Sequence, residues 1–188
     1  MTDIELANTA LSLIRANAIT SFTEGTREAS ASANIMPVLR DEMLREHNWR
    51  FSKKQAALAQ LVATPLYGYL YNYAIPDDCL KVLETKDDSE YTLGNQDDQR
   101  VIRSDETTLS ITYVSRVTNP TLWDSLFVSA YIRRLAAELA IALGASMKLH
   151  QLMVQEYVAL MDSAMATDSI ETGETQLITD TLLVDVRH

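Results

Sequence analysis

The spacing of apolar residues changes twice along this chain of 188 residues. Before residue 48 and after residue 119, apolar side chains recur every three or four positions, which is typical of helices that bury one face. Between residues 49 and 117 they alternate with polar side chains, for example at Leu109, Ile111 and Tyr113, as half-buried strands do. A chain that is helical at both ends and extended in the middle is expected to fold as an α+β protein.

The first 48 residues are expected to form two helices. Thr2 and Glu5 have the spacing of a capping box, which predicts a first helix over residues 3–16. A turn then leads into the second helix, which Pro37 interrupts. Because proline lacks an N–H donor and clashes with the preceding turn, we expect a kink or a break into two helices at this position.

The middle segment is expected to be an antiparallel β unit. Polar turn candidates at residues 86–89, 94–98 and 104–106 separate its strands, and this spacing favours hairpins over βαβ crossovers. A helical hairpin should follow. Asn119 and Pro120 supply an N-cap and a first-turn proline for a long third helix, which Gly144 closes, and Ser146 caps a fourth helix.

The expected architecture is therefore a four-helix bundle with an inserted antiparallel β unit and an extended C-terminal tail. Residues 1–48 would form the N-terminal helices of the bundle, 49–118 the β insertion, 119–167 the C-terminal helical hairpin and 168–188 an acidic tail. Apolar residues of this tail suggest a strand: Leu177, Ile178, Leu182, Leu183 and Val184. Docking of this strand on another subunit is the favoured hypothesis, and closure onto its own sheet and disorder are the alternatives.

Charge and cysteine content exclude several classes of protein. The formal net charge of −10 disfavours general attraction to phosphate backbones or anionic membranes. Cys79 is the single cysteine, so no intrachain disulfide is possible; we expect a buried thiol and assembly in a reducing cytosol. The N-terminus lacks a signal-peptide pattern, and charged residues interrupt the most apolar stretch at 126–143, so a membrane span is not expected.

Motifs for catalysis and for cofactor binding are missing from the sequence. His47, His150 and His188 are scattered, which predicts no metal site, and His47 is expected at the edge of the core or at a helix cap. Neither a phosphate-binding glycine loop nor a nucleophile elbow occurs, so we expect neither an enzyme nor a cofactor. One catalytic alternative is a glycoside hydrolase with paired carboxylates. Its candidate acids, which are more simply interpreted as solvated, are Asp77, Asp78, Glu84, Asp97 and Asp98.

Two groups of residues are candidates for an interface with another subunit or a partner protein. Tyr67, Tyr69, Tyr71 and Tyr73 alternate, so their rings would share one face of an extended segment. Such a face suits a subunit contact, the core or a sugar platform. A basic cluster suggests an acidic protein partner before DNA, although Asp41, Glu42 and Glu46 partly offset its charge. The cluster consists of Arg40, Arg45, Arg50, Lys53 and Lys54.

Several segments in order resemble phage tail tubular protein A, the head-to-tail adaptor of T7-like podoviruses. The resemblance spans residues 4–166, and each motif alone is weak. After the N-terminal helix, the segments that carry it are Thr23-Glu24-Gly25, His47-Asn48-Trp49-Arg50-Phe51, Tyr71-x-Tyr73-x-Ile75-Pro76-x-Asp78-Cys79-Leu80, Tyr113-x-x-Arg116-Val117 and Leu135-Ala136-Ala137-Glu138-Leu139-Ala140.

The resemblance implies a structural protein of the virion neck that is assembled in the host cytoplasm. Copies of the chain would form a dodecameric ring beneath the portal protein. The ring would join the portal to a tail nozzle protein, similar to tail tubular protein B, and to tail fibre proteins. DNA would pass through its channel without specific binding, and an acidic channel wall suits this because it repels phosphate.

Overall fold

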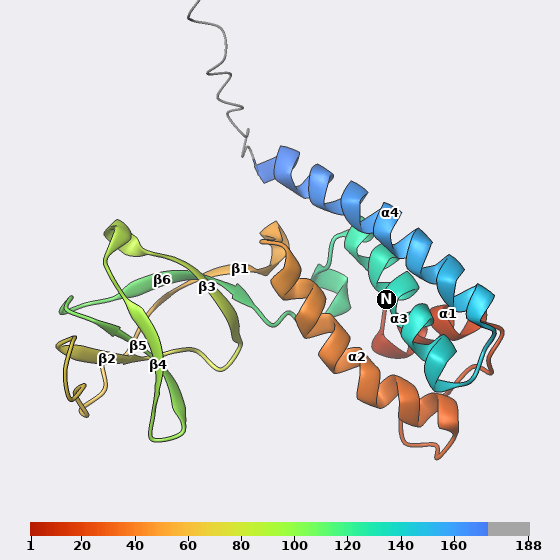
Figure 1. The fold of residues 1–188 in the computed structure, drawn as a ribbon, viewed down its shortest axis with the longest axis horizontal. Helices are drawn as coiled ribbons and strands as arrows, with labels where there is room; N and C mark the ends of the chain where they lie inside the picture. The colour runs from red at the N-terminus through yellow and green to blue at the C-terminus, as the bar shows by residue number, and fades with distance from the viewer. Residues whose placement is uncertain (173–188) are drawn as a thin grey trace, which may run out of the picture.

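The computed structural model describes residues 1–172, which form a helical unit and, beside it, a β unit (Figure 1). The helical unit consists of α1 (Asp3–Leu13), α2 (Arg27–Glu46), α3 (Ser125–Ala142) and α4 (Met147–Thr172). The β unit consists of β1 (Lys53–Ala57), β2 (Tyr71–Ala74), β3 (Cys79–Thr85), β4 (Thr92–Gln96), β5 (Gln99–Ser104) and β6 (Ser110–Ser115). Three short 3-10 helices connect these elements: η1 (Arg50–Ser52), η2 (Lys86–Asp88) and η3 (Pro120–Leu122).

The α+β class is observed, but the predicted four-helix bundle is wrong. Helix α3 is the hub of the helical unit: α1, α2 and α4 each pack on it and make few direct contacts with one another. The reason is that α3 is apolar around most of its circumference. Its buried residues are Phe127, Ala130, Tyr131, Ile132, Leu135, Ala136, Ala137, Leu139 and Ala140. A helix with this pattern is expected in the centre of a core rather than at one corner of a bundle.

The expected capping box of α1 is confirmed. The Thr2 hydroxyl accepts a hydrogen bond from the Glu5 amide, and the Glu5 carboxylate accepts one from the Thr2 amide. The helix ends at Leu13, earlier than residue 16, because Arg15 adopts a positive φ of 60° that cannot continue a helix. Four residues of α1 are buried: Leu6, Ala7, Ala10 and Leu11.

Helix α2 continues through Pro37, so the predicted break is not observed. Pro37 lies on the exposed side of the helix, whereas Met36 and Leu39 are buried on the other side. The Tyr131 hydroxyl donates a hydrogen bond to the Met36 carbonyl across the contact with α3 (2.9 Å). Packing of this face against α3 therefore compensates for the hydrogen bond that proline cannot donate.

The boundaries of the C-terminal hairpin differ in part from the prediction. Asn119 and Pro120 begin η3 rather than the long helix, and Asp124 is the N-cap of α3. Gly144 has the expected positive φ (75°) after α3, and the Ser146 hydroxyl accepts a hydrogen bond from the Leu149 amide as a cap of α4. Helix α4 extends to Thr172, past the expected boundary at residue 167. The strand candidates Leu177, Ile178, Leu182, Leu183 and Val184 lie outside the described residues.

The β unit consists of two antiparallel sheets of three strands each within residues 53–115, with strand orders β1-β6-β3 and β2-β5-β4. The expected antiparallel pairing is confirmed. Residues 94–96 belong to β4, so the turn expected at 94–98 is confined to Asp97 and Asp98. Both have a positive φ, as the two-residue turns that match the twist of a hairpin require.

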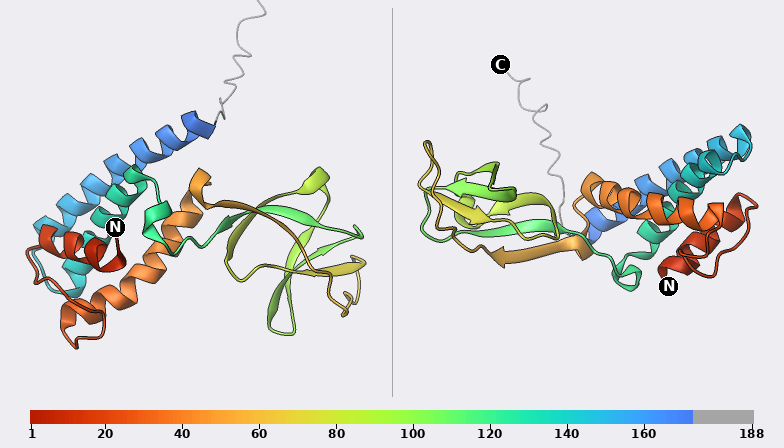
Figure 2. Two further views of the ribbon diagram at one scale, coloured as in Figure 1. Left: turned by 180° about the vertical axis from the view of Figure 1, so that it is seen from behind. Right: turned by 90° about the horizontal axis from the view of Figure 1, so that it is seen from below.

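Each unit has its own group of buried apolar residues. The larger group fills the helical unit and includes Leu80 of β3 and Val114 of β6. The smaller group is formed by residues of both sheets, among them Tyr73, Ile102 and Tyr113. Two further views show the units side by side, with the end of α4 near the start of β1 (Figure 2). Within residues 1–172, none of the helices has the length and apolar character needed to cross a membrane.

Candidate functional site

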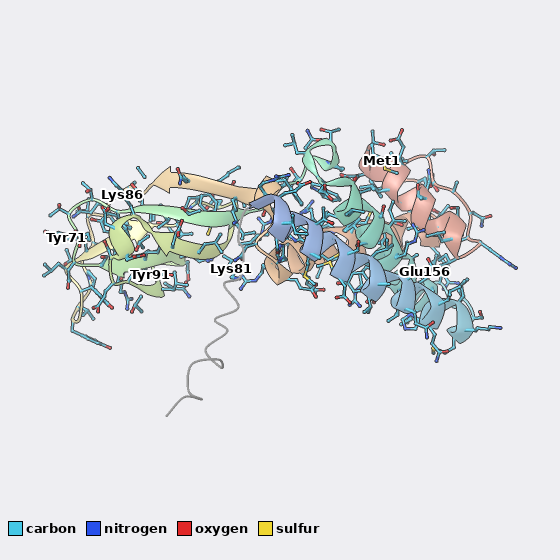
Figure 3. The ribbon with its side chains drawn as sticks, turned by 90° about the horizontal axis from the view of Figure 1, so that it is seen from above. Met1, Tyr71, Lys81, Lys86, Tyr91 and Glu156 are labelled. Atoms are coloured by element: carbon cyan, nitrogen blue, oxygen red, sulfur yellow. The ribbon has the colours of Figure 1, made fainter. Side chains whose placement is uncertain are left out.

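The two units meet where α2 leads into β1 and where β6 leads toward α3. We call this region the junction and define it by residues 45–54, together with Asp41, Asp78, Leu80, Lys81, Tyr113, Arg116, Phe127 and Asp168. Segments that carry the resemblance meet here, although they are far apart in the sequence. In the view from above, Lys81 lies beside the helical unit, whereas Tyr71 lies at the far end of the β unit (Figure 3).

Trp49 is the centre of the aromatic part of the junction. Its side chain is buried, and the indole N–H donates a hydrogen bond to the Met43 carbonyl (2.9 Å). Its ring lies edge-on to Phe127 of α3, with ring centroids 5.0 Å apart, and is stacked with Phe51 at 6.0 Å. These contacts attach the segment before β1 to the hub helix. Aromatic pairs of this geometry stabilise a fold beyond the effect of their buried area.

Asp168 connects the last turns of α4 to the same segment. Its buried carboxylate accepts hydrogen bonds from the Arg50 amide (3.2 and 3.3 Å) and lies 3.0 Å from Nε2 of His47. The Arg50 guanidinium also pairs with Glu171. His47 is the C-cap of α2 and is partly buried, as expected for a residue at the core edge or a helix cap. These hydrogen bonds and ion pairs therefore connect the end of α4 to the end of α2 and to the segment just before β1.

Sequence reasoning missed Asp168 because it placed this residue in the acidic tail. The signal that could have identified it is the helical spacing of the buried face of α4. Met153, Tyr157, Met161 and Ala164 are buried, and residue 168 is the next position of this series. An acidic residue on a buried helix face needs hydrogen-bond partners, which the junction provides.

Polar contacts join α2 to β3 and β6. The Arg45 guanidinium donates to the Leu80 carbonyl. Nε of Arg116 donates to the Asp41 carboxylate (2.7 Å), which also accepts from Nε of Arg40 (3.2 Å). Arg40 and Arg45, which were predicted to face an acidic partner, thus form hydrogen bonds within the chain.

Asp78 lies at the base of β3 and accepts two side-chain hydrogen bonds. The Lys54 ammonium donates to one carboxylate oxygen (2.7 Å) and the Tyr113 hydroxyl to the other (3.1 Å). Burial favours the neutral carboxyl group, but these hydrogen bonds outweigh it and hold the pKa of Asp78 below its ordinary value. Burial and the Asp78 carboxylate raise the pKa of Tyr113 to about 12. Asp78 is therefore ionised at neutral pH and binds structural partners.

Three of the other acids considered for a glycoside hydrolase site lie away from Asp78. Asp97 and Asp98 form the turn between β4 and β5. Glu84 lines an open cavity of about 650 Å³ together with Asp87 and Asp88, and it is the only one of the five candidates that does. Cys79 is buried, as predicted, and burial raises the pKa of its thiol. Within residues 1–172, no three or more His, Cys, Asp or Glu side chains are placed to hold a metal ion.

The four alternating tyrosines do not form one continuous face. Strand β2 begins only at Tyr71, and Tyr73 is buried in the core of the β unit, where its hydroxyl donates to the Glu106 carbonyl. The Tyr69 hydroxyl accepts a hydrogen bond from the Thr92 hydroxyl (3.2 Å). Tyr67 is exposed on the loop before β2. Only Tyr67 is therefore fully available for contact with another molecule.

No protein-family model matches the chain, and a search of the curated proteins finds no significant match.

Proposed function

We propose that the protein is a structural subunit of the neck of a tailed bacteriophage, a head-to-tail adaptor rather than an enzyme. The observation that carries this proposal is the junction. The segments at 47–51, 78–80 and 113–117 carry much of the resemblance. Residues in or beside them make the hydrogen bonds that hold the helical unit against the β unit: Arg45 with the Leu80 carbonyl, Lys81 with Asn48, and Arg116 with Asp41. A fixed orientation of two binding units is what an adaptor requires.

The arrangement of the units supports this role. They form the two ends of an elongated molecule, so each can contact a different partner (Figure 2). In the proposed assembly, the helical unit contacts the portal protein, and the β unit faces the tail nozzle and fibre proteins. Copies form a dodecameric ring, and DNA passes through the channel without specific binding. The net charge of −10 supports this last point because acidic walls repel phosphate.

The glycoside hydrolase alternative has less support. A pair of catalytic carboxylates has to flank one substrate bond, and one of the two has to be protonated at the working pH. Asp78 has a lowered pKa and two structural partners, and Asp97 and Asp98 occupy a tight turn. Of the candidates, only Glu84 lines the cavity beside β3. The geometry therefore favours a structural role for these acids.

The test is reconstitution with the portal protein of the same virion. Purified chain is mixed with portal rings and imaged by electron microscopy, and a second ring stacked on the portal is the expected result. A monomeric free protein is compatible with the proposal because the portal can template the ring. Absence of both a stacked ring and co-migration over several salt concentrations would reject it. Purified virions should also contain the chain at a copy number close to that of the portal.

A further inference from the structure

The loop between β1 and β2, residues 58–70, is an apolar surface that the junction does not involve. It belongs to a stretch, residues 55–76, without any Asp, Glu, Lys, Arg or His. The loop nevertheless lies in solvent: the relative exposure is 102% for Val62, 98% for Leu66, 86% for Tyr67 and 60% for Leu70. Single exposed apolar side chains are ordinary, whereas a group of large ones within one loop indicates a binding surface.

Hydrogen bonds hold the base of the loop in a defined shape. The Leu61 amide donates to the Asn72 carbonyl (2.8 Å), and the side-chain amide of the buried Asn72 donates to the Ala63 carbonyl (2.9 Å). At the other end, the Leu70 amide donates to the Asp105 carboxylate (2.8 Å). The apolar tip is thus presented by an anchored loop. A preorganised loop loses less conformational entropy when it binds a partner.

Acidic residues border the uncharged loop. The Asp105 carboxylate accepts the hydrogen bond of the Leu70 amide, and the neighbouring Glu106 accepts that of the Tyr73 hydroxyl through its backbone carbonyl, which leaves its carboxylate exposed. Such a border is repelled by an anionic lipid surface. The complementary surface is instead an apolar pocket with Lys or Arg side chains at its edge.

One groove of this chain resembles such a pocket, because it combines apolar side chains with basic ones. Ile14, Leu149 and Leu152 line it, together with Arg15 and Lys148. The groove lies between the end of α1 and the start of α4. The loop lies at the opposite end of the molecule, as Figures 1 and 2 show. Parallel subunits of a ring do not bring opposite ends of the molecule together, so the proposed function argues against a second copy as the occupant.

We infer that the loop inserts into an apolar pocket of a different protein in the same assembly, and that basic side chains at the edge of this pocket face Asp105 and Glu106. This inference rests on the proposed function. Leu66 and Tyr67 are the anchors because they are adjacent, have larger apolar side chains than Val62 and are almost fully exposed in the free chain. A stable contact buries roughly 800 Å² on each partner, so the acidic border forms part of the polar rim around these anchors.

A photo-cross-linking experiment in virions tests the inference. A benzophenone amino acid replaces Tyr67 in one preparation and, as the matched control, Leu93 of β4 in another; Leu93 is also exposed in the β unit but lies outside the loop. The expected product joins position 67 to a different virion protein, in a peptide with apolar and basic residues, at least fivefold more often than position 93. Cross-links to another copy, equal yields at both positions or no product would overturn the inference.

Substitution of Leu66 supplies an independent readout. Leu66→Ser should lower the yield of infectious particles at least tenfold, whereas Leu66→Met should stay within twofold of the natural chain because it preserves an apolar anchor. Portal binding and circular dichroism should be unchanged in both variants. Full infectivity of Leu66→Ser would contradict the inference alone. If the natural chain is absent from virions, the proposed function itself is wrong.

Discussion

At the scale of single residues, Trp49 shows how one side chain can attach the segment that leads into the β unit to the helices. Its indole N–H donates a hydrogen bond to the Met43 carbonyl near the end of α2, and its ring packs against both Phe51 and Phe127. The sequence identifies Trp49 as part of a motif, but a tryptophan after a helix is common. Its function as a connection becomes visible only when α3, more than 70 residues later, is placed beside it.

Trp49→Phe should destabilise the chain by about 1–3 kcal/mol. The substitution removes the hydrogen bond to the Met43 carbonyl and leaves a small cavity beside Phe127. Urea unfolding followed by circular dichroism measures the change. Leu122→Ala is the control, because Leu122 is exposed and its removal should change the free energy of unfolding by less than about 0.5 kcal/mol. Equal effects of the two substitutions would contradict the role given to Trp49.

Asp78 should make the stability of the fold depend on pH. Its pKa is lowered in the folded chain, whereas a carboxyl group of this kind has a pKa of about 3.9 in an unfolded chain. The folded state therefore favours the charged form. This contribution to stability is fully present above the unfolded pKa and is lost as the pH falls through the lowered folded pKa.

Asp78→Asn should accordingly be less stable than the natural chain at pH 7, and the difference should shrink as the pH is lowered toward 2. Urea midpoints measured across this range test the prediction. Asp77→Asn is the matched control, because the contacts described for Asp77 use its backbone carbonyl rather than its carboxylate. A difference for Asp78→Asn that stays constant with pH would show that the charge of this carboxylate does not contribute.

At the scale of elements, α4 illustrates what periodicity can and cannot predict. The spacing of its apolar residues predicted a helix, but the helix was expected to end before Asp168 because the following residues are polar and acidic. The partners of Asp168 are the Arg50 amide and the His47 ring. These partners lie more than 110 residues earlier, so no local pattern reveals the contact. Arg45 and the Leu80 carbonyl are 35 residues apart, so no local pattern reveals their hydrogen bond either.

Asp168→Ala should weaken the contact between the end of α4 and the segment just before β1. The substitution removes a partly buried hydrogen bond between the Arg50 amide and a charged group, which costs about 1.5–3 kcal/mol. Hydrogen exchange should become at least tenfold faster at the Arg50 amide. Asp162→Ala is the control, since Asp162 lies on the exposed face of α4. Unchanged exchange at Arg50 in the Asp168→Ala variant would show that the carboxylate does not protect this amide.

Removal of the segment after α4 is a separate experiment with a separate expectation. A chain that ends at residue 172 keeps Asp168 and Glu171, and therefore the contacts of both with Arg50. It should retain the circular dichroism spectrum and the unfolding midpoint of the full chain; if the proposed adaptor function is right, it should enter the virion less efficiently. A chain that ends at residue 167 should in addition be less stable. Equal stability of the two truncated chains would contradict the role of the last turn.

At the scale of the whole molecule, periodicity predicted which parts are helical and which are extended, but not how they pack. The α+β class and the antiparallel pairing follow from the spacing of apolar residues. The central position of α3 follows from its buried residues on several sides, among them Phe127, Ile132 and Leu135. The sequence shows these apolar residues, but their periodicity alone does not say which of the four helices is central. The division of the strands into two sheets depends on pairing between distant segments, such as β1 with β6, which no local pattern specifies.

Strands β3 and β6 contribute to both groups of buried residues, and this sharing predicts the unfolding behaviour of the molecule. In β3, Leu80 packs in the helical group and Val82 in the β group; in β6, Val114 and Tyr113 are divided in the same way. Strands β3 and β6 supply buried side chains to both units. If either unit unfolded alone, the other would therefore expose apolar side chains or lose strands that it needs. Calorimetry should therefore show one cooperative transition with equal calorimetric and van't Hoff enthalpies, and the isolated segment 49–118 should not fold. Two separated transitions, or a folded isolated segment, would show that the units are independent domains and that the junction alone holds them together.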